Sequence, residues 1–145
     1  MSRRRDGEFH SYSEARKAMI DYYNAGVRDY NKGNFSGATR WWRLASRLSW
    51  IDEKNIRHEI GLQQAAVMLG KLALRKTDFS QARVHFDRAY ELGYTDALVF
   101  LAKIALKTDV EKAKMLLLKA IREGSSDALE LYKQLIQTER KNGAF

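Results

Sequence analysis

The chain has 145 residues, of which 45% are hydrophobic and 30% are charged, and its formal net charge at pH 7 is +8. This length and balance predict one soluble globular domain rather than a disordered chain. There is no cysteine, which excludes disulfides, zinc sites with thiolate ligands and cysteine nucleophiles. No apolar run approaches the roughly 18 residues that a membrane span needs, so a cytoplasmic protein without a membrane span is expected.

Residues 1–10 are predicted to form a flexible basic N-terminal arm. The three arginines at 3–5 are not followed by the apolar stretch of an export signal. Positive charge is concentrated at this end of the chain, since residues 1–50 hold ten Lys or Arg against five Asp or Glu. Such an excess favours partners that are acidic or carry phosphate. The rest of the chain, residues 11–145, is expected to form a single repeat domain.

An internal repeat organises this domain. Segment 89–98 recurs as segment 120–129, and a degenerate earlier copy occupies residues 45–52. The two clear copies share a glycine followed three residues later by an aspartate: Gly93 and Asp96, then Gly124 and Asp127. Glycine suits the left-handed residue that ends a helix, and aspartate suits the first turn of the next helix, where free N–H groups point outward. The pattern predicts three helix–turn–helix junctions.

A second pattern lies just before each junction: an alanine, a large apolar residue four positions on, and an alanine three beyond. These spacings place the three residues on one face of a helix. The small residues let a neighbouring helix approach while the large one fills the gap. The three copies are Ala38, Trp42 and Ala45; Ala82, Phe86 and Ala89; and Ala113, Leu117 and Ala120.

The helices that precede the first two copies contain Gly26 and Gly70, and a turn follows at Gly33. These residues resemble tetratricopeptide repeats, and the third copy, with its acidic start at Asp109, is similar to a Sel1-like repeat. The resemblance covers about residues 19–129. It implies an all-α fold, a right-handed α-solenoid of about three helix–turn–helix repeats with a capping helix at its C-terminal end. The expected repeats are residues 19–52, 53–93 and 94–124, and the expected capping helix is 127–141.

The repeats are unevenly spaced, because the first alanines of the three copies lie 44 and then 31 residues apart. The additional length precedes the second repeat. Ile56, Ile60 and Val67 continue an apolar helical spacing there, so one long helix is predicted from about Asp52 to Arg75.

Three helix starts have independent support in the sequence. Ser11 and Thr108 are each followed three residues later by glutamate. This is the spacing of a capping box, in which two side chains satisfy free backbone N–H groups. Asp78, followed by glutamine at the same distance, is a weaker version.

No motif with catalytic or metal-binding spacing stands out. His58 and Glu59 begin like a zinc-protease helix, but the residue where the second histidine would stand is Leu62. Gly70 and Lys71 lack the serine or threonine of a phosphate-binding loop. We therefore expect a protein that is not an enzyme and that holds no cofactor and no metal.

The resemblance implies a concave groove lined by the first helix of each repeat, a surface that relatives use to hold peptides. The residues it places there are Tyr23, Val27, Tyr30, Val67, Lys71 and Leu74. Chaperone-binding relatives clamp a terminal carboxylate with basic and amide side chains, which Tyr23 and Val27 do not match. An apolar ligand such as an amphipathic helix fits better. The alternative is that the chain's own arm or long second-repeat helix covers the groove.

A second candidate surface is basic. Arg40, Arg43 and Arg47 are spaced by three and four residues and form a stripe on one helix, with Trp41 nearby. Arginine beside an exposed aromatic side chain is common at protein-binding hot spots and at stacked nucleotides. A solvated convex face is the plainer interpretation.

These features predict a non-catalytic adaptor or chaperone-like protein that binds an apolar helical or acidic segment of another protein. The first alternative is a nucleic-acid-binding or regulatory protein that uses the arginine clusters. The second is a self-associating protein, a homodimer joined through the groove or through Trp41 and Trp50.

Overall fold

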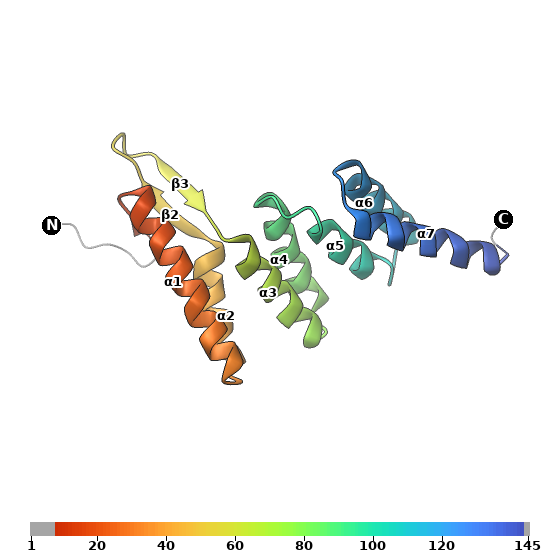
Figure 1. Ribbon diagram of the computed structural model, residues 1–145, viewed down its shortest axis with the longest axis horizontal. Helices are drawn as coiled ribbons and strands as arrows, with labels where there is room; N and C mark the ends of the chain where they lie inside the picture. The colour runs from red at the N-terminus through yellow and green to blue at the C-terminus, as the bar shows by residue number, and fades with distance from the viewer. Residues whose placement is uncertain (1–7, 144–145) are drawn as a thin grey trace.

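The computed structural model describes residues 8–143 (Figure 1). Most of them are helical: α1 (Tyr12–Asn31), α2 (Phe35–Ser46), α3 (Gln63–Arg75), α4 (Phe79–Glu91), α5 (Ala97–Ala105), α6 (Val110–Arg122) and α7 (Ser126–Lys141). A small sheet adds β1 (Glu8–Phe9), β2 (Leu48–Ile51) and β3 (Arg57–Ile60). The predicted helical class is confirmed, and the sheet is an addition that the sequence patterns did not predict. None of the described helices is long and apolar enough to cross a membrane.

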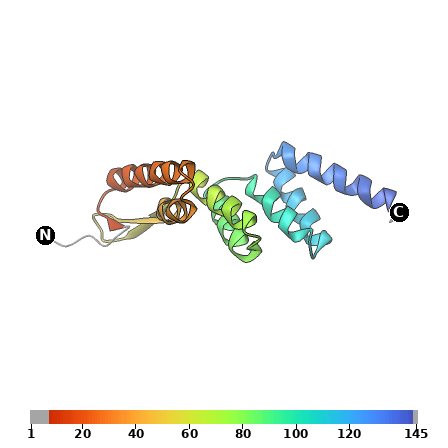
Figure 2. The ribbon, with the colours of Figure 1, turned by 90° about the horizontal axis from the view of Figure 1, so that it is seen from below.

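The helices pack in chain order. Helices α1 and α2, α3 and α4, and α5 and α6 form three pairs, and contacts of α2 with α3, α4 with α5, and α6 with α7 connect them. The result is an elongated molecule with α1 near one end of the long axis and α7 near the other (Figures 1 and 2).

Each helix pair is closed by the predicted pattern of two alanines and one large residue. All nine residues of the three copies are fully buried. A Cβ atom added to Gly70 would lie 2.6 Å from Cζ of Phe86, and one added to Gly26 would collide with the ring of Trp42. Only glycine lets the facing helices approach this closely. The predicted packing is confirmed.

Two of the three predicted junctions are also confirmed. Gly93 and Gly124 follow α4 and α6 with φ angles of 98° and 97°, the left-handed conformation that ends a helix. Asp96 directly precedes α5, and Asp127 lies in the first turn of α7.

The N-cap residue of the predicted capping pairs is confirmed at two of three sites. Ser11 and Asp78 each accept a hydrogen bond from the backbone N–H three residues on. The prediction at Thr108 is wrong, because Asp109 caps α6, with its Oδ1 accepting from the backbone N–H of Lys112 at 3.0 Å. A carboxylate also meets the positive end of the helix dipole, which favours aspartate over threonine at this position.

The junction predicted at 45–52 and the long helix predicted from Asp52 to Arg75 are wrong. The chain leaves α2 as β2 and returns antiparallel as β3, and α3 begins only at Gln63. Asp52 accepts backbone hydrogen bonds from Lys54 and Ile56 with its Oδ1, both at 2.9 Å, and Asn55 adopts a φ of 63°. Aspartate and asparagine in these roles make a tight turn rather than a helix start.

The predicted flexible arm is corrected at its inner end. Glu8 and Phe9 form β1, which pairs in parallel with β2 so that Phe9 lies opposite Trp50. Residues 1–7 of the arm lie outside the described residues. The Trp50 ring stacks on His58 at 4.5 Å and meets Tyr12 edge-on at 6.0 Å, so the sheet is tied to the start of α1.

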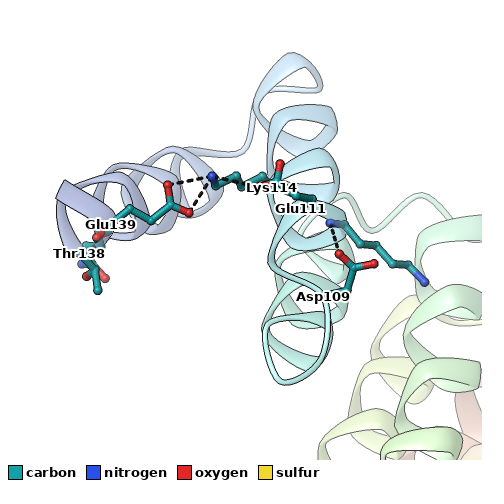
Figure 3. A network of polar contacts seen from close by, with 7 residues as sticks. Asp109, Glu111, Lys114, Thr138 and Glu139 are labelled. Atoms are coloured by element: carbon teal, nitrogen blue, oxygen red, sulfur yellow. Dashed lines mark hydrogen bonds and ion pairs between the residues drawn. The ribbon is translucent and has the colours of Figure 1, made fainter. Parts of the chain in front are cut away.

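An ion pair joins the C-terminal half of α7 to α6 (Figure 3). The Nζ of Lys114 in α6 lies 2.7 and 2.8 Å from the two carboxylate oxygens of Glu139 in α7, and 3.4 Å from Glu111 Oε1. The hydrogen bond to Glu139 raises the pKa of Lys114. Helix α7 therefore lies along α6, and its bounds agree within one residue with the predicted helix at 127–141.

Candidate binding groove

A pocket of about 210 Å³ lies between α1 and α3, beside the turn that leads into α5. It is lined by Tyr23, Gln63, Gln64, Val67, Met68, Lys71 and Tyr94. Tyr23, Val67 and Lys71 are three of the six groove residues that the resemblance implied, and the structure brings them together. The pocket is open among the described residues, and the hairpin that replaces the predicted long helix does not line it.

A second hollow of about 400 Å³ lies between α5 and α7 and shares Tyr94 with the first. Its other lining residues are Asp96, Val99, Phe100, Lys103, Asp127, Glu130, Leu131 and Gln134. Lys71 of the first pocket also reaches Phe100 of the second, with its Nζ 5.8 Å from the ring centroid. The two hollows adjoin at Tyr94, and we call the surface that contains both of them the helix groove; its lining comes from α1, α3, α5, α7 and the turn before α5.

The remaining predicted groove residues lie elsewhere. The Tyr30 ring packs 5.8 Å from that of Trp42, and its hydroxyl accepts a hydrogen bond from Arg75 at 3.1 Å. Val27 packs against the Trp42 cluster, and Leu74 against the larger core of the following helices. These three side chains are half-buried against neighbouring helices and do not line the pocket.

The centre of the helix groove is an aromatic ring flanked by two lysines. Phe86 covers one face of Phe100, with ring centroids 4.5 Å apart and the rings nearly parallel. The Nζ atoms of Lys71 and Lys103 lie 5.8 and 5.7 Å from the Phe100 centroid. An ammonium group is attracted to the face of an aromatic ring, and this attraction positions both lysines.

Tyr94 joins the two hollows and supplies a hydrogen-bond donor. Burial raises the pKa of its phenol, and the nearby carboxylates of Asp96 and Asp127 raise it further. The hydroxyl therefore stays protonated at neutral pH and can donate to a ligand. The same shift reports a negative field at the α7 side of the groove.

The structure divides the predicted basic surface into two parts. In the first, Arg40 and Trp41 line a hollow of about 290 Å³ together with Asp29. The Trp41 ring stacks on Tyr22, with centroids 5.7 Å apart and an interplanar angle of 25°. One face of this tryptophan is therefore already occupied.

The second part of the basic surface adjoins α4 and the hairpin. Arg43 lines a different hollow together with His85, and Arg47 lies 4.0 Å from Glu59 of β3. Burial lowers the pKa of His85, and the positive charges of Arg43 and then Arg47 lower it further. The three arginines thus contact different neighbours rather than forming one free stripe.

Sequence reasoning missed most of the groove residues beyond α1. Gln64 and Met68 precede Lys71 by seven and three residues and so share its helix face, which the spacing alone could have shown. Phe100 and Lys103 were missed because the third repeat departs most from the pattern that located the first two.

Comparison with protein-family models, with curated proteins and with solved structures finds no match to this chain. Among residues 8–143, no group of three or more histidine, aspartate or glutamate side chains is placed to hold a metal ion.

Proposed function

We propose that this protein is a non-catalytic adaptor that binds a segment of another protein in the helix groove. The main support for this proposal is that residues far apart in the sequence, from Tyr23 to Gln134, line the two adjoining hollows of the groove. The proposal includes the arrangement of the helix pairs as a right-handed solenoid of tetratricopeptide-like or Sel1-like repeats with α7 as its cap.

The shape of the groove supports a chain segment as ligand rather than a small molecule. Small-molecule sites are usually single concave pockets that enclose most of the ligand. Here two shallow hollows succeed each other along four helices. A helix or an extended peptide lying across helices buries its apolar side chains in successive hollows of this kind.

The chemistry of the walls supports the same conclusion. Tyr23, Val67 and Met68 offer apolar and aromatic surface, and the glutamine and lysine side chains of α3 offer polar groups. Tyrosine in a half-buried position is a frequent anchor of protein interfaces. No step of bond making or breaking is needed to explain this combination.

The test is selection of phage-displayed random peptides on the full chain, followed by affinity measurement on two matched variants. Tyr23→Ala removes an aromatic wall of the groove, while Tyr22→Ala removes the neighbouring tyrosine that stacks on Trp41 outside it. Both variants keep the hydrogen bond from Trp42 Nε1 to the backbone carbonyl of residue 23. Tyr23→Ala should weaken peptide binding about tenfold or more, the effect of losing one hot-spot side chain.

The control variant Tyr22→Ala should bind the selected peptides like the wild type. Melting curves of both variants show whether each is folded at the temperature of the binding assay. Failure to enrich any peptide, or equal affinities of the two variants, would contradict the proposed function.

A second candidate function, nucleic-acid binding, is favoured by one observation. Trp41 is partly exposed beside Arg40, an arrangement on which a base can stack. Binding of a single-stranded oligonucleotide should then weaken steeply as salt concentration rises, because phosphate contacts release counterions. A flat salt response, or unchanged binding by Trp41→Ala, argues against this candidate.

A further inference from the structure

The helix groove is charged differently along its length, and this division specifies its ligand if the proposed function holds. Its middle carries two ammonium groups, those of Lys71 and Lys103. The hollow between α5 and α7, which Lys103 also lines, carries three carboxylates: Asp96 just before α5, and Asp127 and Glu130 of α7. The pocket between α1 and α3 is largely apolar.

We infer that the ligand is an amphipathic protein segment whose apolar anchor, acidic residue and basic residue follow one another along the groove. The anchor occupies the pocket beside Tyr23, the acidic residue crosses Phe100, and the basic residue meets the carboxylates beside α7. This inference rests on the proposed function and adds the chemistry of its ligand.

The acidic residue follows from the two lysines. Both ammonium groups lie over one aromatic ring whose other face Phe86 covers, and both lysine residues are exposed. Within the described part of the chain, neither lysine forms an ion pair. A carboxylate that lies over this part of the groove is attracted by both ammonium groups. A ligand carboxylate therefore has a prepared position here.

The basic residue follows from the α7 side of the groove. The hydroxyl of Ser125 donates to Asp96 Oδ1 at 2.6 Å, which fixes this carboxylate at the groove wall. Asp127 and Glu130 line the same hollow from α7 and are exposed. Three carboxylates against the single ammonium group of Lys103 leave this hollow with a negative balance, which attracts an ammonium or guanidinium group of a ligand.

The apolar anchor completes the order. Val67 and Met68 form the wall of the first pocket, and Lys71 stands one helical turn further along α3, towards Phe100. A segment that fills this pocket and continues to α7 crosses α3 and α5, which carry the two lysines, before it reaches Asp127 and Glu130 of α7. The protein is strongly basic overall. Its groove nevertheless carries charges of both signs, so it favours a ligand in which an acidic and a basic residue follow the apolar anchor in a defined order.

The test uses the peptide selection with reversed charges. The double variant Lys71→Glu and Lys103→Glu inverts the middle of the groove. The matched control, Lys107→Glu and Lys119→Glu, reverses two lysines that lie over Phe79 and Tyr90 at 4.9 and 4.8 Å, outside the residues that line the groove. Both double variants have the same net charge and lose the same kind of cation–aromatic contact.

Peptides enriched on the wild type should contain an acidic residue between an apolar residue and a basic one. The groove variant should bind them at least about tenfold more weakly, and the control should bind them within about twofold. A synthetic peptide whose acidic residue is replaced by lysine should recover binding on the groove variant. This recovery excludes simple loss of folding as the cause.

The outcomes separate the two claims. Peptides that depend on Tyr23 but bind both double variants equally overturn the charge order and leave the adaptor function standing. Enriched peptides without an acidic residue do the same. Peptides that are insensitive to Tyr23→Ala and to both double variants, or the absence of any enrichment, overturn both claims.

Discussion

The first two helix pairs have the same interior packing, but the chain follows a different path after each of them. In α1 and α2 the Trp42 ring lies against Gly26, and in α3 and α4 the Phe86 ring lies against Gly70. After α4 the chain turns back at once through Gly93 and enters α5. After α2 it continues as a β-hairpin before α3 begins.

The difference depends on the first residues after each helix. After α4, Leu92 keeps nearly helical angles and Gly93 then adopts a left-handed φ of 98°, which reverses the chain within one turn. Arg47, the residue after α2, has extended backbone angles of −147° and 96° and leads directly into β2. Without a left-handed residue at this position the chain stays extended and finds its hydrogen bonds in a sheet.

Arg88 connects the first two helix pairs, which no tight turn joins. This buried side chain of α4 donates from Nε to the carbonyl of Ser46 at the end of α2, at 3.0 Å, and from Nη1 to Glu91 at 3.2 Å. The end of α2 is therefore held by the second helix pair, across the insertion. The packing inside each helix pair and the path of the chain after it are therefore determined by different residues.

The largest expected effects test the shared interior. Trp42→Ala and Phe86→Ala each leave a large cavity in a fully buried position and should each lower the free energy of unfolding by about 3–5 kcal/mol. Urea denaturation followed by far-UV circular dichroism gives both values. A loss below about 1 kcal/mol for either variant would show that the two pairs are not built alike.

Added volume at the facing glycines should have a smaller effect. Gly26→Ala and Gly70→Ala place a Cβ against an aromatic ring and should cost about 1–3 kcal/mol, despite the better helix propensity of alanine. Gly124→Ala is the contrasting variant, since its Cβ meets open space and only its φ of 97° opposes the change, at about 1 kcal/mol. Equal melting temperatures for Gly70→Ala and the wild type would refute the close-packing argument.

Removing the bridge between the two pairs should be felt locally. Arg88→Ala leaves the buried carbonyl of Ser46 without its donor, which should cost about 1–3 kcal/mol. Hydrogen exchange should speed up most in β2 and β3 and least in α5 to α7. Arg83→Ala, an exposed arginine of the same helix, is the control and should change stability by less than about 0.5 kcal/mol. Uniformly faster exchange in Arg88→Ala would argue against a local bridge.

The smallest effect concerns the hairpin at low pH. The hydrogen bond with His58 lowers the pKa of Asp52 below its ordinary value of 3.8, and the backbone N–H of Ile56 lowers it further. A carboxyl group whose pKa is lower in the folded state stabilises the fold above pH 3.8, and this stabilisation is lost as pH falls through the folded-state pKa. Amide exchange in the hairpin should therefore increase below about pH 3.8, and Asp52→Asn should lose that pH dependence, whereas exposed Glu53→Gln should keep it.

The interior of the helix pairs could be predicted from the sequence because it depends on local spacing. An alanine, a large residue and a second alanine specify one helix face wherever they occur. The hairpin could not be predicted in the same way, since Ile56 and Ile60 have helical spacing and each strand is only four residues long. The residues that indicate the hairpin are those of its turn, from Asp52 to Asn55. Gly61, where a Cβ would collide with the Ser46 carbonyl, indicates where the hairpin ends.

The candidate groove residues named from the resemblance divide into two groups. Tyr23, Val67 and Lys71 line one pocket. The resemblance does not determine how deep a side chain lies, and Tyr30 and Leu74 pack inward against neighbouring helices. Burial of this kind depends on tertiary contacts that no single helix encodes.

The mainly sequential helix contacts have a mechanical consequence. Because each helix packs mainly against its neighbours along the chain, a force applied to the two ends passes through every interface in series. Small rotations at successive interfaces add up, so the molecule is compliant along its length. The weakest helix–helix interface limits its stiffness. Stretching therefore changes how the four helices that line the groove are spaced, and with this the shape of the helix groove.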